Sequence, residues 1–352
     1  MPRNKRRRTT PFAPPPPPSS SAAPPGGTTM SEIEEIEPFP RFDVVPDDSD
    51  HFYRNASLPI PAPTQKKIMR EWKLLEQHLP ESITVRAYEK RVDLLRAAIV
   101  GAAATPYHDG LYFFDISFPR NYPAQPPLVH YLSLGYRINP NLYPTGTVCL
   151  SLLNTWSGIM HVLGKRKSER WNPKESTILQ VLLSIQALVL NERPYFNEPG
   201  YGIFMPGTYG EKKSLAYNED TFVLSCMSML RLLAAPPRAF EVFVAWHFRD
   251  RARTILSACE AYASGRVQVG YFWDGAPLQG PSRVAVSQKF EDAMKSLYPL
   301  LFKAFSKEGA SLAGLRQELS LDQKGRNPPP APGKKGLVMC VVGMVKKFLG
   351  LK

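Results

Sequence analysis

The sequence has few cysteines and no long apolar run. Its four cysteines, Cys149, Cys226, Cys259 and Cys340, lie far apart and form no Cys-x-x-Cys pair. This spacing excludes the common zinc-ligand patterns and a dense disulfide framework, and it is typical of a reducing compartment. No stretch of about 18 uncharged apolar residues occurs, and the N-terminus lacks the apolar core of a signal peptide. These absences predict a soluble, intracellular protein, cytoplasmic or nuclear, without a metal site.

Acidic residues are outnumbered by basic ones. The 352 residues include 44 lysines and arginines against 31 aspartates and glutamates, which gives a formal net charge of +13. This balance favours acidic partners such as nucleic acid, anionic lipid or an acidic protein surface. The aromatic residues do not interleave with the basic ones as a stacking surface for bases requires. Nucleic-acid binding is therefore not expected.

Composition predicts one folded core between two tails. Residues 1–60 are basic, then proline-rich, then acidic, which predicts disorder. Residues 61–262 form the expected core, and 263–352 the expected linker, weak helix and C-terminal tail. In the first tail the run Lys5 to Arg8 is either a nuclear import signal or solvated charge. In the last, residues 337–351 suit an amphipathic helix that packs on its own domain, on a partner or on a membrane surface.

Apolar periodicity predicts the first elements of the core. Ile68, Trp72 and Leu75 recur at helical spacing, and Pro80 ends this helix. Four short apolar runs separated by proline and glycine then predict an antiparallel meander. The expected strands cover residues 83–87, 94–100, 111–118 and 128–132.

Helices are expected after an irregular stretch at 135–170. Such a stretch is unusual inside a compact domain unless it carries function. A cap residue, a proline and a glutamate within 172–175 predict the start of a buried helix that runs to Leu190. Two further helices are expected over 212–234 and 237–262. Their apolar faces place three reactive residue types in the core rather than in a ligand set: Cys226, His247 and Cys259.

Cys149 lies in the irregular stretch among residues that bend the backbone, where a large substrate can reach its sulfur. Asn141 stands upstream, and its amide can donate a hydrogen bond to the oxyanion of acyl transfer. The segment has no His or Lys base beside the cysteine, which disfavours a thiol protease. A thioester carrier needs only a modest thiolate fraction, and a free cysteine with a pKa of about 8.5 supplies several per cent near neutrality.

Several segments resemble the ubiquitin-conjugating enzymes, the E2 family. Asn139-Pro140-Asn141 stands where that family has His-Pro-Asn upstream of its active cysteine, and 105–113 is similar to its strand-entry motif. Residues 122–127 match its Tyr-Pro-x-x-Pro-Pro turn, and Trp171-Asn172-Pro173 resembles its tryptophan turn. Leu150 to Trp156 is similar to the large E2s, among them E2/E3 hybrids and plant members. The likeness covers residues 64–235 in the family's order.

The resemblance implies an α+β fold of UBC type. It consists of an N-terminal helix, a four-stranded antiparallel meander, an active-site loop, a central buried helix and C-terminal helices. By the same resemblance Cys149 carries ubiquitin as a thioester, and Asn141 stabilises the oxyanion or holds the active-site loop. An acidic residue past the central helix orients and desolvates the incoming amine. Glu198 is the candidate for this acidic residue, although Asn197 could align with the family position instead. The alternative for Glu198 is an exposed loop acid without a catalytic role.

The resemblance also implies the partners. These are ubiquitin, the E1 activating enzyme and protein substrates, while the need for an E3 ligase stays open. ATP is used by the E1, so no cofactor is expected on this chain. A catalytically inactive E2-like scaffold that binds ubiquitin is the alternative; such scaffolds lack the cysteine, whereas this chain retains Cys149 and Asn141.

Three departures from the family bear on partner choice. Asn139 replaces the family histidine at a position that is mainly structural. Ala124 stands where many E2s carry an aromatic residue for E3 domains, and Trp171 to Lys174 replace small residues of the second E3-facing loop. The stretch after Cys149 is long and holds the basic cluster Lys165-Arg166-Lys167. That cluster either recognises an acidic surface with little E3 help or is a solvated loop.

Overall fold

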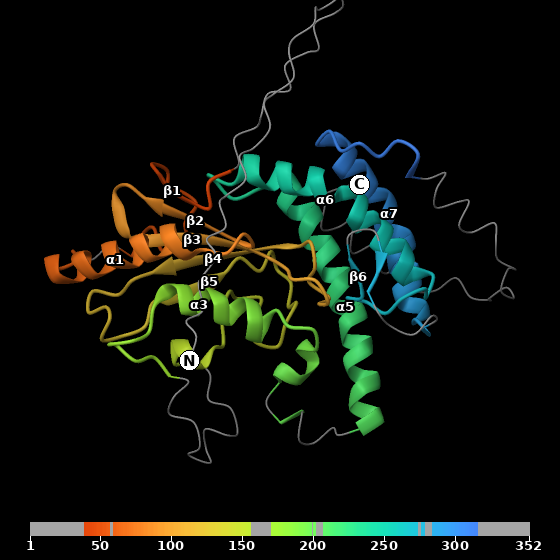
Figure 1. Cartoon of the computed structure of the whole chain (residues 1–352), viewed down its shortest axis with the longest axis horizontal. Coiled ribbons are helices and arrows are strands. Elements are labelled where there is room, and N and C mark those ends of the chain that lie inside the picture. The colour runs from red at the N-terminus through yellow and green to blue at the C-terminus, as the bar shows by residue number, and fades with distance from the viewer. Residues whose placement is uncertain are drawn as a thin grey trace, which may run out of the picture. The chain divides into compact units, whose positions relative to one another are not determined.

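The computed structural model describes residues 39–56, 59–155, 170–198, 200–201, 207–273, 276–278 and 284–315 (Figure 1). The basic run at Lys5, the basic cluster at Lys165 and the expected helix over 337–351 lie outside the described residues. Within the described residues no helix is both long enough and apolar enough to cross a membrane.

A five-stranded sheet, in the order β1-β2-β3-β4-β5, forms the centre. Strands β2 to β5 pair antiparallel and confirm the predicted meander. The sequence did not predict β1, which adds a fifth strand in a parallel pair, with Phe42 opposite Val85. This strand is four residues long and only half-buried. Its sequence therefore shows no clear alternation of apolar and polar residues from which a strand could be predicted. The strands are β1 (Phe42–Val45), β2 (Ile83–Tyr88), β3 (Arg91–Val100), β4 (Leu111–Ser117) and β5 (Leu128–Tyr131).

Two helices cover one face of the sheet. The first is α1 (Ala62–His78), as predicted, and the second is α3 (Ile178–Ser184), which continues as the π-helical segment η3 (Ile185–Val189). Their buried side chains share one hydrophobic cluster with β2, β3 and β4. The expected helix start at 172–175 was wrong. Thr177 caps α3 instead, since its side chain accepts from the Gln180 amide while the Gln180 side chain accepts from the Thr177 amide.

Three helices form a second hydrophobic cluster on the opposite face of the sheet. They pack there against the residues of β3 and β4 that alternate with those of the first cluster. They are α5 (Gly207–Ala234), α6 (Glu241–Ala263) and α7 (Gln288–Lys307), which pack side by side in Figure 1. Cys226, His247 and Cys259 are buried here, which confirms their core assignment. The boundary at residue 262 was wrong, because α7 buries a regular apolar stripe against α5 and α6. That stripe consists of Phe290, Met294, Leu297, Leu301 and Phe305.

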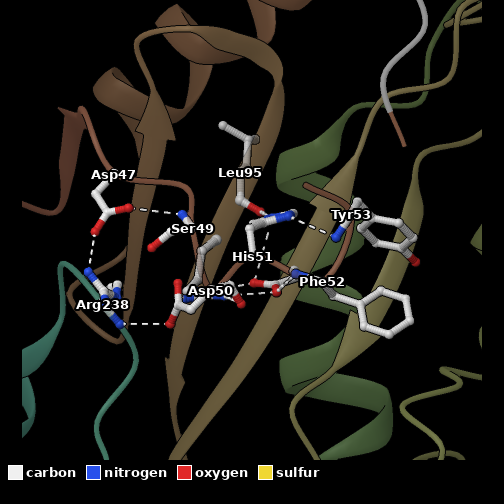
Figure 2. Close-up of polar contacts among 10 residues, drawn as sticks. Asp47, Ser49, Asp50, His51, Phe52, Tyr53, Leu95 and Arg238 are labelled. Atoms are coloured by element: carbon white, nitrogen blue, oxygen red, sulfur yellow. Dashed lines mark hydrogen bonds and ion pairs between the residues drawn. The ribbon is translucent and has the colours of Figure 1, made fainter. Parts of the chain in front are cut away.

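The segment before α1 is folded from residue 39, so the expectation of disorder through residue 60 was wrong there. His51 is fully buried, and its Nε2 lies 3.0 Å from the Leu95 carbonyl oxygen (Figure 2). Asp50 pairs with Arg96 at 2.7 Å. Composition misled because these acidic residues have basic partners far along the chain, as Asp47 has in Arg238 at 2.7 Å.

Two short helical turns and a small two-stranded ribbon complete the described part. The helical turns are η1 (Ser151–Leu153), directly after Cys149, and η4 (Pro194–Asn197), directly before Glu198. Strands β6 (Phe272–Trp273) and β7 (Ala276–Pro277) pair with each other after α6. The two turns place Cys149 and Glu198 at the ends of short, well-defined segments.

Candidate active site

The loop that carries Cys149 folds back on itself as a narrow hairpin. Leu142 bridges Val148, and Thr147 bridges His130 of β5. The turn is made by Gly146, whose φ of +86° suits glycine. A Cβ there would lie 2.0 Å from the His130 ring, so no larger residue fits. These contacts hold the loop against the edge strand β5. The loop therefore has a defined geometry although it contains no regular helix or strand.

Cys149 and Asn141 hold each other through two hydrogen bonds. The Cys149 amide donates to the Asn141 carbonyl at 2.8 Å, and Asn141 Nδ2 donates to the Cys149 carbonyl at 2.8 Å. Asn141 is 9% exposed, and its Oδ1 is buried without a hydrogen-bond partner among the described residues. The structure therefore brings the two predicted residues together. In this arrangement the Asn141 amide holds the loop.

Asn139 is the centre of a buried amide and hydroxyl cluster beneath the loop. Its Nδ2 donates to the Tyr107 hydroxyl and to the Val189 carbonyl, both at 2.7 Å. Its Oδ1 accepts from the Asn141 amide at 2.8 Å and from Asn197 Nδ2 at 3.4 Å. Asn139 thus takes the structural part that the sequence assigned to it. The cluster joins the loop to η3 and η4.

The Cys149 thiol is partly buried, and its surroundings pull on its pKa in opposite directions. Burial is the largest effect and raises the pKa above its usual value. A hydrogen bond with the Tyr143 side chain and the positive charge of Arg137 lower it, while the negative charge of Glu198 raises it. The net pKa is raised, so the resting thiol is mostly protonated at neutral pH. This suits a carrier that exchanges acyl groups without constant risk of alkylation.

Glu198 lies within electrostatic range of the cysteine, and its contacts differ from those of Asn197. The Asn197 amide is engaged, since its Oδ1 accepts from Asn191 at 2.7 Å and its Nδ2 donates to the Val189 carbonyl at 3.0 Å. Glu198 is 38% exposed, and its Oε2 lies 3.7 Å from Arg137 Nη2. Of the two candidates, Glu198 is the more exposed, and its one cationic partner is a loose pair with Arg137.

Two residues of the site, Arg137 and Tyr143, were not singled out from the sequence. The Arg137 guanidinium lies 4.7 Å from the centre of the Tyr143 ring and donates to the Pro140 carbonyl at 3.3 Å. Both flank the Asn139-Pro140-Asn141 motif by two residues. The segment between them is a turn, in which the Leu142 amide donates to the Asn139 carbonyl at 3.1 Å, so no regular alternation marked these two residues in the sequence.

Trp171 is buried at 7% exposure rather than presented on a surface. Its Nε1 donates to the Pro123 carbonyl at 2.7 Å, and its ring centre lies 5.7 Å from that of Tyr122. It therefore fastens the tryptophan turn to the turn that contains Ala124. The two segments expected to face an E3 are joined into one unit.

Fold and site together define a class: an α+β protein that presents one partly exposed thiol on a rigid hairpin loop. Residues 67–201 match the family described as ubiquitin-conjugating enzyme. The chain is 48% identical over 279 residues to ubiquitin-conjugating enzyme E2 38 of Arabidopsis thaliana, which covers 78% of this chain and 83% of that protein. The chain belongs to the ubiquitin-conjugating enzyme family, and its α+β fold is the UBC fold.

Two further relatives place the chain within that family. Ubiquitin-conjugating enzyme E2 25 of Arabidopsis thaliana is 52% identical over 272 residues, which is 76% of this chain and 43% of that protein. The dual E2 ubiquitin-conjugating enzyme/E3 ubiquitin-protein ligase BIRC6 of Homo sapiens is 36% identical over 244 residues, 64% of this chain and 5% of that protein. The chain thus spans less than half of E2 25. The resemblance to plant members of the large E2 group is confirmed.

Proposed function

We propose that the chain is an E2 enzyme that accepts ubiquitin from an E1 as a thioester on Cys149 and transfers it to substrate lysines. The supporting observation is the reciprocal pair between Cys149 and Asn141, which holds a partly exposed sulfur on a rigid loop. The partners are ubiquitin, the E1 and protein substrates. ATP is consumed by the E1, and the chain itself needs no cofactor.

In the loading step the Cys149 thiolate attacks the carbonyl carbon of the E1-bound thioester. A new C–S bond forms, the C–S bond to the E1 breaks, and the E1 cysteine leaves as a thiolate. The pKa of Cys149 is raised by burial, so loading uses a minor thiolate fraction. The Tyr143 hydrogen bond and Arg137 stabilise that fraction.

In the transfer step a lysine amine attacks the thioester carbon, a C–N bond forms, the C–S bond to Cys149 breaks, and Cys149 leaves as a thiolate while the second proton of the nitrogen passes to that thiolate or to water. Before attack the amine must lose a proton, because its pKa is about 10.4 in water. In this proposal Glu198 binds the ammonium and accepts that proton or passes it to water, which its pairing with the Arg137 cation at 3.7 Å supports. Asn141 keeps the loop in place, so the thioester carbonyl meets the amine in one orientation.

The decisive experiment incubates the full chain with E1, ATP and ubiquitin and examines the products on a non-reducing gel. The expected product is an adduct that a thiol reductant cleaves. Cys149→Ala should abolish it, and Cys149→Ser should give an ester that resists the reductant. A labile adduct on Cys149→Ala would place the thioester elsewhere, and no adduct on the wild type would favour the inactive scaffold.

A further inference from the structure

Arg137 contacts three parts of the site at once. Its Nη2 lies 3.7 Å from Glu198 Oε2 and 3.3 Å from the Pro140 carbonyl oxygen, and the guanidinium lies 4.7 Å from the Tyr143 ring centre. The pair with Glu198 is loose and half-exposed, with side-chain exposures of 47% and 38%. The other two contacts fasten the guanidinium to the Cys149 loop. Arg137 can therefore release Glu198 without leaving the site.

The carboxylate of Glu198 has one resting cationic partner and one catalytic one. An acceptor lysine arrives as an ammonium and needs a carboxylate beside the thioester. In the structure the guanidinium of Arg137 already neutralises that carboxylate. Two cations cannot share it without mutual repulsion, so the ammonium must compete with Arg137.

We propose that Arg137 is a specificity-determining residue, whose guanidinium holds the Glu198 carboxylate until an acceptor ammonium displaces it. The proposal rests on the proposed function of Cys149. It makes the resting site selective, because a free amine has to compete with an intramolecular cation that is always present at high local concentration. A lysine of a bound substrate protein is also present at high local concentration, so it can displace Arg137 from the Glu198 carboxylate.

The test is single-turnover discharge of the ubiquitin thioester of the full chain to free L-lysine over a range of concentrations. Arg137→Gln removes the competing charge, so the apparent KM for lysine should fall about two- to five-fold, the range expected for an exposed ion pair. The maximal rate should change less than the KM. Arg137→Lys keeps a cation and should restore a KM near the wild-type value. Arg137→Met should repeat the Arg137→Gln result with an uncharged stem.

Arg193 offers a matched control. It is 43% exposed, it pairs with Glu211, and its guanidinium lies 4.9 Å from the centre of the Phe196 ring. Arg193→Gln should leave the KM for lysine unchanged. Adding Glu198→Gln to Arg137→Gln should abolish the fall in KM, because no carboxylate is left to compete for.

The outcomes separate the two proposals. If the wild type forms no thioester, the proposed function is overturned, and the proposed role of Arg137 as a competitor for Glu198 is overturned with it. Normal loading with an unchanged or higher lysine KM in Arg137→Gln overturns the part of Arg137 alone. A fall in KM that persists in the double variant with Glu198→Gln also overturns it, since competition for Glu198 would not be the cause.

Discussion

Beneath the Cys149 loop lies a cluster of amides and hydroxyls, whereas the opposite face of the sheet carries a cluster of charges. The first surrounds Asn139, which is fully buried. The second joins Arg96 to Asp115 by two hydrogen bonds of 2.6 and 2.9 Å, with Arg96 fully buried and Asp115 at 1% exposure. Both clusters join segments that are distant in the sequence. The Asn139 cluster does so through neutral hydrogen bonds and the Arg96 cluster through charged groups.

The difference separates chemistry from stability. Amides do not titrate, so the geometry of the Cys149 loop stays constant over the pH range in which the thiol ionises. A buried ion pair stabilises only while both partners are present, and removal of one leaves an uncompensated charge. Changes to the Arg96 cluster should therefore alter folding, and changes around Cys149 should alter rates.

Removal of one buried charge should have the largest effect. Asp115→Ala removes the buried partner of Arg96, which keeps only the partly exposed Asp50, and also removes the acceptor of the Phe52 amide, which donates to Asp115 at 2.7 Å. The free energy of unfolding should fall by about 3–5 kcal/mol, measured by urea denaturation. Lys289→Ala, which breaks the exposed pair with Asp220, is the control and should cost less than about 1 kcal/mol. Similar losses in the two variants would contradict the comparison.

Loss of the neutral cluster should cost less. Asn139→Ala leaves the buried Asn141 amide without its acceptor and removes one of the two donors to the Val189 carbonyl, so the free energy of unfolding should fall by about 2–3 kcal/mol. Asn139→Asp sharpens the comparison. Burial should raise the pKa of the new carboxyl, so the loss of stability relative to the wild type should be smallest at low pH and grow as pH rises. A flat pH profile for Asn139→Asp would contradict the neutral character of the cluster.

Acid should weaken the fold through buried histidines. Burial lowers the pKa of His51, His130 and His247 below the usual value. The unfolded chain therefore binds protons first as pH falls below about 6.5, and stability decreases there. Urea denaturation at pH 7.5 and 5.5 checks this. His51→Gln should flatten the decrease in part, because burial is what lowers the pKa of His51.

The smallest effect concerns the thiol alone. Tyr143→Phe removes a hydrogen bond that lowers the pKa of Cys149, so that pKa should rise further. Alkylation by iodoacetamide at pH 7.5 should slow about two- to ten-fold, with unchanged urea stability. Tyr209→Phe on the exposed side of α5 is the control. A loss of stability without a shift in the alkylation profile would make Tyr143 structural.

The sequence predicted those parts of the molecule whose pattern is local. The meander and α1 follow from apolar periodicity, and Cys149 with Asn141 from a motif of fixed spacing. Glu198 was placed by alignment, and the structure sets it near the thiol. The start of α3 was wrong because two capping patterns lie five residues apart, at Asn172 and Thr177, and only packing chooses between them.

Long-range partners could not be predicted. The acidic residues near Asp50 gave a composition typical of disorder, because nothing local shows that Arg96 neutralises one of them. The apolar stripe of α7 needed α5 and α6 as partners before it could count as core. Arg137 was missed for a similar reason, since its ring and carboxylate partners meet only after the loop folds.

The turn at Gly146 bears on how a shortened protein should be made. Its backbone touches the His130 ring, and that ring stacks on Phe52 at 3.5 Å between centres. A recombinant fragment cut at residue 60 would discard Phe52 and leave one face of His130 bare, although the cut lies far from Cys149 in sequence. A fragment that keeps the Cys149 loop supported on this side must therefore include Phe52.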